Sequence, residues 1–291
     1  MKFSNFEYHA PASPVEVVEL LSQYAGEAKI IAGGQSLLPT MAYRMAQPAA
    51  LVDLKNVPDL NYISLKADGV HIGARTRWRD IEDSEVLARA HPLLQEAVHH
   101  VAHYQIRNRG TVGGSLAHGD PASELPCIAV TCDAQLRILG PKGERTIKAD
   151  GFFTGPLSTE LAEDEMILAF QLPFWPAQRR WAFQEFARRA GDFAMAGIAL
   201  FYDLDAQQRA TNVHIGVVGA CSTPRRLGRA EAALNGKKID AASIEAAACA
   251  ASDEVDPTTD IHATAAYRRS LVATLLKRSL KEAQERVSTG A

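Results

Sequence analysis

Two glycine-rich stretches decide the fold of this 291-residue chain: KIIAGGQSLL at residues 29–38 and IRNRGTVGGSLAHGDPASELP at residues 106–126. In the first stretch, the apolar run at residues 29–32 predicts a short buried strand that leads into Gly33-Gly34. Glycine permits positive backbone φ and lets N–H groups approach phosphate oxygens without an intervening Cβ. One loop of this kind is often an ordinary turn. Two such loops, each close to hydroxyl side chains, predict a clasp for a pyrophosphate.

The first loop also invites comparison with the Rossmann dinucleotide-binding fingerprint. Asp53 follows the glycines at the distance expected of an acid that binds a ribose. The fingerprint, however, requires G-x-G-x-x-G, and the run here is GGQSLL at residues 33–38. The third glycine is missing, so a Rossmann fold is not expected.

The other elements are predicted from hydrophobic periodicity and from turn residues. Ser13 as N-cap, Pro14 at the first helical position and Glu16 as the capping acid predict the start of a helix. The remaining expected helices are at residues 91–106, 124–134 and 263–285, and the expected strands are at 51–54, 70–74, 135–139, 180–187, 196–204 and 211–218. Sheets followed by helices, without regular βαβ alternation, indicate an α+β fold. The two prolines of LPFWP at residues 172–176 predict a domain boundary.

Composition excludes several classes of protein. The chain is 47% hydrophobic and 22% charged with a net charge of −3, which is ordinary for a globular protein and gives no basic surface for nucleic acid. No apolar run is long enough to predict a transmembrane segment, and the first residues lack the features of a secretory signal. The expected location is therefore the cytoplasm.

Cysteine and histidine spacing argues against a metal site in this chain. Cys127 and Cys132 form C-x4-C, which opens a plant-type ferredoxin motif, but no cysteine follows two residues later. Reduced, mostly buried thiols are expected instead of a cluster. His99 and His103 would share one face of the helix expected at 91–106, as a metal pair does. The catalytic glutamate of an H-E-x-x-H site is absent, so a polar surface or a contact with a partner is the preferred interpretation.

At this point a family resemblance becomes specific. The two glycine motifs resemble the paired FAD-binding signatures of the medium subunit of molybdenum hydroxylases, a family that includes the xanthine, carbon monoxide and N-heteroaromatic dehydrogenases. VGACSTPRRLGRAEAALNG at 218–236 and TAAYRRSLVATLLKRSLKEA at 264–283 resemble the C-terminal domain of that family. The resemblance implies a two-subdomain FAD-binding fold of the vanillyl-alcohol oxidase (PCMH) type plus a C-terminal α+β domain. The implied domains are 1–60, 61–176 and 177–291.

The resemblance also implies which residues bind the cofactor. The family's first FAD loop corresponds here to Lys29, Ile30, Ala32, Gly33, Gly34, Gln35, Ser36 and Leu37, and the second to Thr111, Gly113, Gly114 and Ser115. His118 stands where relatives approach the flavin or its ribityl chain, and Glu124 stands where they carry a hydrogen-bonding carboxylate. Phe193 lies in ARRAGDFA at 187–194, where an aromatic ring covers the flavin; ordinary core packing is the alternative.

The implied function is electron transfer. FAD would be held non-covalently and would pass electrons from 2Fe–2S clusters on a small partner subunit to an external acceptor. Substrate would be oxidised at a molybdenum cofactor on a large partner subunit, in a complex of paired heterotrimers, and no residue of this chain is expected to be catalytic. Two rivals remain: a self-sufficient flavoprotein oxidase of the vanillyl-alcohol oxidase type, and a nucleotide-binding regulatory module without redox turnover.

Overall fold

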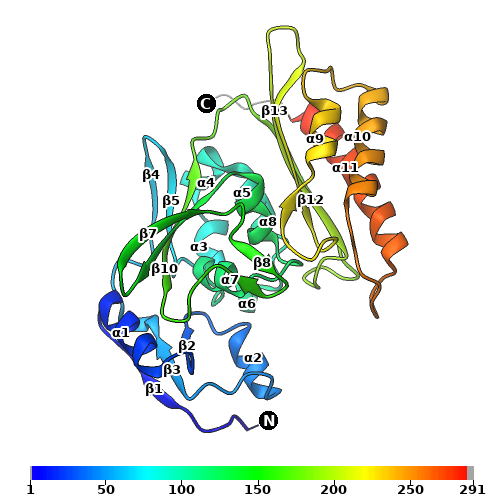
Figure 1. Cartoon of the computed structure of the whole chain (residues 1–291). Helices are drawn as coiled ribbons and strands as arrows, with labels where there is room; N and C mark the ends of the chain where they lie inside the picture. Colours follow the sequence, from blue (N-terminus) through cyan, green and yellow to red (C-terminus); the bar gives the residue numbers. More distant parts are fainter. Residues whose placement is uncertain (1, 287–291) are drawn as a thin grey trace.

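The structure is a computed structural model that describes residues 2–286, and it consists of three successive lobes (Figure 1). The N-terminal lobe contains a parallel sheet of order β1-β3-β2, formed by β1 (Glu7–His9), β2 (Ala28–Ile31) and β3 (Ala50–Asp53). Helix α1 (Pro14–Tyr24) begins where the Ser13 hydroxyl accepts the Glu16 N–H, and it packs against this sheet. A short helix α2 (Leu37–Ala42) and a 3-10 turn (Leu54–Asn56) complete the lobe.

The central lobe is built on a five-stranded antiparallel sheet of order β4-β5-β10-β6-β7. Its strands are β4 (Ile63–Lys66), β5 (Gly69–Gly73), β6 (Gln135–Gly140), β7 (Gly143–Lys148) and β10 (Met166–Pro173), and a small hairpin is formed by β8 (Phe153–Gly155) and β9 (Ser158–Thr159). Its helices are α3 (Trp78–Glu82), α4 (Glu85–Ala90), α5 (Pro92–Val98), α6 (Tyr104–Arg107), α7 (Val112–His118) and α8 (Glu124–Thr131). Alternate side chains at the start of β10 pack into two cores: Met166 and Leu168 pack into the N-terminal lobe, and Ile167 between them packs into the central lobe.

The C-terminal lobe has a four-stranded antiparallel sheet whose two faces are both covered. The strands are β11 (Arg180–Phe186), β12 (Ala196–Leu204), β13 (Ala210–Val218) and β14 (Arg225–Arg226), and the helices are α9 (Gly228–Leu234), α10 (Ala241–Glu254) and α11 (Ala265–Glu285). Phe183 and Phe201 join the central core, whereas Ile198 and Leu200 pack beneath the three helices on the outer face of the sheet (Figure 1). This double burial explains why β12 is apolar along most of its length.

The architecture is therefore α+β, as expected. The three sheets fall within residues 1–60, 61–176 and 177–286, and we propose the boundaries near 60 and 176 as the domain boundaries. Pro173 is the last residue of central strand β10, and the chain leaves the central sheet there. Within residues 2–286 no helix is both long enough and apolar enough to cross a membrane.

One predicted element is wrong. The single helix expected at residues 91–106 is two short helices, α5 and α6, separated by a turn in which Ala102 adopts a φ of 43°. His99 and His103 therefore do not share a helical face. His99 lies 3.4 Å from a Glu82 carboxylate oxygen, and the His100 ring packs against Phe183. His99 is exposed, whereas His100 is half-buried where its ring meets Phe183 of the C-terminal lobe. Only part of the expected polar surface is therefore exposed.

Candidate functional site

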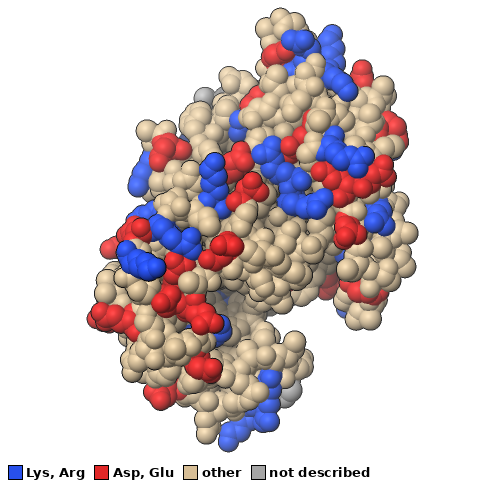
Figure 2. All heavy atoms as spheres, viewed as in Figure 1, with Lys and Arg blue, Asp and Glu red and all other residues tan. Residues whose placement is uncertain are grey.

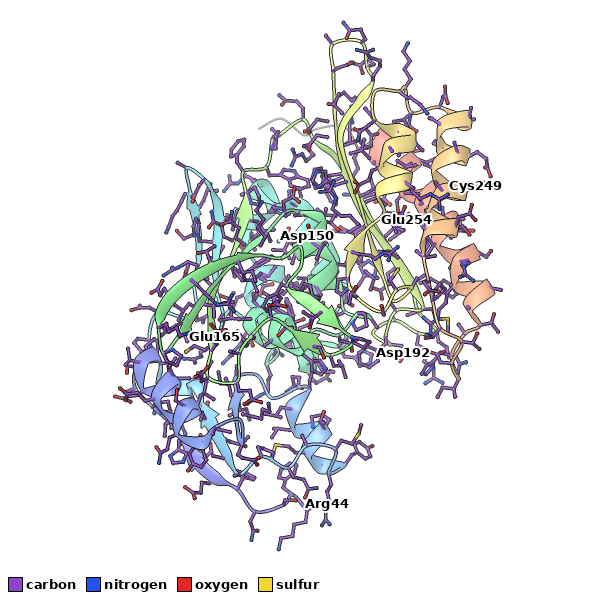
Figure 3. All side chains as sticks on the ribbon, viewed as in Figure 1. Arg44, Asp150, Glu165, Asp192, Cys249 and Glu254 are labelled. Atoms are coloured by element: carbon purple, nitrogen blue, oxygen red, sulfur yellow. The ribbon has the colours of Figure 1, made fainter. Side chains whose placement is uncertain are left out.

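All fifteen residues assigned to cofactor binding line one cavity of about 1440 Å³. The cavity opens between the N-terminal lobe and the rest of the molecule, where Figure 2 shows a deep hollow. Asp192, which lines the cavity, lies across this hollow from Arg44 of the N-terminal lobe (Figure 3). The volume exceeds the ~300–1,000 Å³ typical of small-molecule pockets, so it suits an extended ligand such as a dinucleotide.

The first glycine loop presents unpaired backbone donors to the cavity. Within residues 2–286, the N–H groups of Gly34, Gln35 and Ser36 have no intramolecular acceptor. Gly34 has a φ of +73°, a left-handed conformation that favours glycine, and the loop ends where α2 begins. Successive unpaired N–H groups in such a turn form a concave site for an anion. The side-chain amide of Gln35 donates to the Gly33 carbonyl and so stiffens the loop.

The N–H groups of the second glycine loop already have acceptors within the protein. The Gly113 N–H donates to the Ala74 carbonyl over 2.8 Å, and the Gly114 N–H donates to the Thr111 hydroxyl over 3.2 Å. A Cβ on Gly113 would lie 2.7 Å from the Ala74 Cβ, so glycine is required here for close packing. The loops also touch each other, because a Cβ on Gly33 would lie 2.2 Å from the Arg109 carbonyl oxygen. The two loops are therefore alike in sequence but different in role: the first offers donors, and the second supports it.

One buried carboxyl group lines the cavity, and a second lies close enough to respond to its charge. Glu124 is the first residue of α8, and its burial raises its pKa to about 7. Burial and the charge of Glu124 raise the pKa of Glu185 on β11 to about 9. The Glu185 Oε2 atom is buried and has no hydrogen-bond partner within the described residues. A protonated carboxyl at Glu185 follows from this environment at neutral pH.

We expect Glu185→Gln to stabilise the protein in alkaline solution. The pKa of Glu185 is higher in the folded chain than its ordinary value of 4.5, because the folded state disfavours the charged carboxylate. The folded state therefore loses stability relative to the unfolded state as the pH rises toward about 9. The neutral amide removes that loss, while at pH 5 the variant and the parent should be alike. Thermal unfolding midpoints measured between pH 5 and 9 test this. The exposed Glu160 provides a control as Glu160→Gln, and identical pH dependence of the Glu185 variant and the parent would contradict the prediction.

Phe193 comes from the segment between β11 and β12, and His118 comes from the end of α7. Phe193 is 75% exposed, so the alternative that it is ordinary core is wrong. It follows Gly191, whose φ of +84° and close contact with His103 exclude a larger residue. His118 is half-buried in the last turn of α7, before the left-handed C-cap Gly119. Both side chains line the same cavity.

Sequence reasoning missed a group of residues that the C-terminal lobe contributes to the cavity. Arg268 on α11 is 6% exposed and donates to the carbonyls of Met195 and Gly219 and to the Asp260 carboxylate. The Ala263 backbone N–H, together with that of His262 and with Arg268, lowers the pKa of Asp260 to about 2. Arg268 thus ties the start of β12, the end of β13 and the 256–263 segment together beside the cavity. Gly219 and Arg268 lie in the two stretches that resemble the C-terminal domain of the family, but neither stretch shows that they meet beside the cavity, because three separate parts of the chain supply this group.

Comparison with known proteins first defines the class. Residues 4–175 match the family model described as the FAD binding domain in molybdopterin dehydrogenase, and residues 181–283 match the CO dehydrogenase flavoprotein C-terminal domain. Together these matches define an FAD-binding flavoprotein.

Individual relatives narrow the class further. The chain is 41% identical to the nicotine 6-hydroxylase medium subunit of Paenarthrobacter nicotinovorans, over 98% of this chain and 100% of that one. It is 37% identical to the carbon monoxide dehydrogenase medium chain of Hydrogenophaga pseudoflava, over 97% and 98% of the two chains. Solved structures agree: carbon monoxide dehydrogenase from H. pseudoflava superposes with a TM-score of 0.95 at 38% identity, over 98% and 99% of the chains. Quinoline 2-oxidoreductase from Pseudomonas putida 86 superposes with a TM-score of 0.92 at 37% identity, over the same shares.

The chain therefore belongs to the family of FAD-binding medium subunits of molybdenum hydroxylases. It is the flavoprotein subunit of a multi-subunit molybdenum-dependent oxidoreductase. The resemblance noted from its glycine motifs is confirmed, as is the type of FAD-binding fold.

Proposed function

We propose that this chain holds FAD non-covalently in the large cavity, with the pyrophosphate on the first glycine loop. The observation that carries the proposal is that the N–H groups of Gly34, Gln35 and Ser36, three successive residues that line the cavity, have no acceptor within residues 2–286. The remaining contacts that we assign to FAD are Lys29, Ile30, Ala32, Gly33, Leu37, Thr111, Gly113, Gly114, Ser115, His118, Glu124 and Phe193, all of which line the cavity.

The protein's own residues bind, orient and shield the cofactor, while bound FAD supplies the capacity to accept and release electrons. Phe193 is the exposed aromatic group that we assign to the flavin face. The carboxyl of Glu124 has a pKa raised to about 7 and can hold a proton beside the cavity at neutral pH. Arg268 keeps the walls of the C-terminal lobe in place.

We further propose the direction of electron flow. A large subunit with a molybdenum cofactor oxidises the substrate, a small subunit carries 2Fe–2S clusters, and FAD on this chain delivers the electrons to an external acceptor. The expected assembly is a pair of heterotrimers in the cytoplasm. Two relatives are named as a medium subunit and a medium chain, which supports the existence of partner subunits for this chain. We assign the 2Fe–2S clusters to the small subunit.

The isolated chain should be reducible by dithionite and inert toward organic substrates. We expect flavin bands near ~370 and ~450 nm without iron–sulfur absorption, because those bands belong to the cofactor itself. Stopped-flow mixing with heteroaromatics, aldehydes and alcohols tests this, and addition of the cluster and molybdenum subunits should restore turnover. Rapid bleaching of the flavin by an organic substrate without partners would favour a self-sufficient oxidase. A colourless protein that binds only nucleotide would favour a regulatory module.

Phe193→Ala should change the flavin more than it changes the fold. The ring is exposed and makes no core contact, so its loss should leave the unfolding midpoint within about 1 °C of the parent. Flavin fluorescence and the rate of reoxidation by dioxygen should both change, because the flavin face becomes open to solvent. The exposed Tyr43 of the N-terminal lobe, changed to alanine, is the matched control. Unchanged spectra and reoxidation rates would remove Phe193 from the site.

A further inference from the structure

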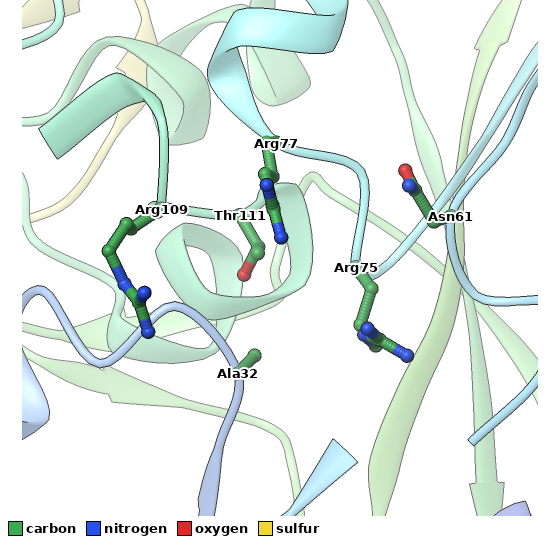
Figure 4. A pocket seen from close by; sticks show the side chains of 6 residues that line it. All are labelled: Ala32, Asn61, Arg75, Arg77, Arg109 and Thr111. Carbon is green, nitrogen blue, oxygen red and sulfur yellow. The ribbon is translucent and has the colours of Figure 1, made fainter. Parts of the chain in front are cut away.

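A second, smaller cavity adjoins the point where the two glycine loops touch. It measures about 60 Å³ and is lined by Ala32, Asn61, Arg75, Arg77, Arg109 and Thr111. Figure 4 shows the side chains of Arg77, Arg109 and Thr111 extending into the same space above Ala32, with Arg75 beside them. Three guanidinium groups thus come from two different segments, before α3 and before α7, to one small polar hollow.

The charges in this hollow are not balanced by the protein. Within residues 2–286, the Arg75 guanidinium donates only to the backbone carbonyls of Lys55 and Val57, over 3.1 and 3.0 Å, which fixes its position. Within residues 2–286, the guanidinium groups of Arg77 and Arg109 make no hydrogen bond or ion pair. The nearby carboxylate of Asp80 accepts the backbone N–H of Arg77, not its guanidinium. Like charges held together without a counter-ion repel one another, so the site favours an anion.

The small cavity is separate from the large one. None of its three arginines lines the large cavity, whereas Ala32 and Thr111 line both. The partition is the contact between the loops, where Gly33 approaches the Arg109 carbonyl so closely that a Cβ would not fit. A ligand in the large cavity, such as the FAD of the proposed function, therefore lies on the other side of this contact from the arginines.

We propose that Arg75, Arg77 and Arg109 form a binding site for a phosphate-type oxyanion, distinct from the cofactor site. Guanidinium forks match tetrahedral oxyanions through paired N–H donors, and the Asn61 amide and Thr111 hydroxyl add neutral partners. A water needs roughly 10–15 Å³ of such space, so about 60 Å³ fits a group of four or five heavy atoms. Arg77, Arg109 and Asn61 are exposed, so a phosphate monoester can enter with the rest of its molecule in solvent.

Calorimetric titration of the flavin-loaded full chain with inorganic phosphate tests the site. We expect one phosphate per chain, bound without loss of flavin. Arg77→Gln and Arg109→Gln should each weaken binding about tenfold or more, because each removes charge-assisted hydrogen bonds. Arg278→Gln, an exposed arginine on α11 outside both cavities, should bind as the parent does. The natural ligand is either free phosphate or the phosphate group of a nucleotide, and a parallel titration with adenosine monophosphate distinguishes them. Tighter binding than that of phosphate indicates a nucleotide, and equal or weaker binding indicates the free ion.

Two results would overturn the proposal. Phosphate binding that is absent, or unchanged in both arginine variants, would leave no oxyanion site in the hollow. Phosphate binding that displaces flavin would place the ion in the large cavity instead. The titration reads phosphate directly, so a chain that fails to retain flavin would contradict the proposed cofactor binding without deciding this site.

Discussion

Replacement of Gly33 by alanine is expected to release most of the bound FAD. The added Cβ would lie 2.2 Å from the Arg109 carbonyl oxygen and 2.9 Å from the Gly110 Cα, and both are backbone atoms that cannot rotate away. The two loops must separate, at a cost of about 1–3 kcal/mol, which corresponds to roughly a ten- to hundredfold loss of affinity if the closed arrangement is needed for binding. The ratio of flavin to protein absorbance after gel filtration measures the effect.

A matched pair of glycine variants separates loss of the site from loss of stability. Gly34 and Gly236 have nearly the same φ, +73° and +77°, so alanine strains the backbone of both turns similarly, although a Cβ at Gly34 would also lie 3.0 Å from the Leu38 side chain. Gly34 lies in the first loop, whereas nothing lies within 4 Å of the Cβ that would be added at Gly236. Gly34→Ala should lower flavin retention and Gly236→Ala should not. Full retention by both Gly33→Ala and Gly34→Ala would refute the assignment of the pyrophosphate to this loop.

Arg268→Met is expected to cause the largest loss of stability outside the apolar cores. The substitution leaves the carbonyls of Met195 and Gly219 without their donor and removes the ion pair with Asp260. Unpaired buried polar groups and a broken, partly buried ion pair together cost about 3 kcal/mol. Thermal or urea unfolding measures this loss, and flavin retention should fall as well, because the three segments that Arg268 joins form a wall of the cavity.

The neighbouring arginine provides the control for this prediction. Arg269 lies 3.8 Å from an Asp256 carboxylate oxygen, and 42% of its side chain is exposed. An exposed ion pair of this kind contributes about 0–1 kcal/mol, so Arg269→Met should hardly change the free energy of unfolding. Equal destabilisation by the two variants would mean that the effect at Arg268 comes from the helix surface and not from the buried contacts.

The regular elements follow from the sequence where the pattern is local. The sequence predicts the helix after Ser13-Pro14, the three long strands of the C-terminal sheet and the final helix to within a few residues, because caps and apolar periodicity depend on neighbouring positions. Strands β7 and β10 were not predicted. The residues of β7 are mostly exposed and polar, and β10 is central only because the sheet order places it between β5 and β6.

The sequence by itself determined the family and the two glycine motifs, because the motifs are contiguous and their residue types are required by backbone geometry. Only the tertiary structure decided that the two loops differ in role. Whether a backbone N–H is unpaired depends on acceptors that are distant in the chain. The Ala74 carbonyl, for example, accepts the Gly113 N–H. The same holds for the effect of the Glu124 charge on the pKa of Glu185, the position of Arg268, and the convergence of Arg77 and Arg109. Burial and charge at these positions are properties of segments brought together by packing, and no local pattern encodes them.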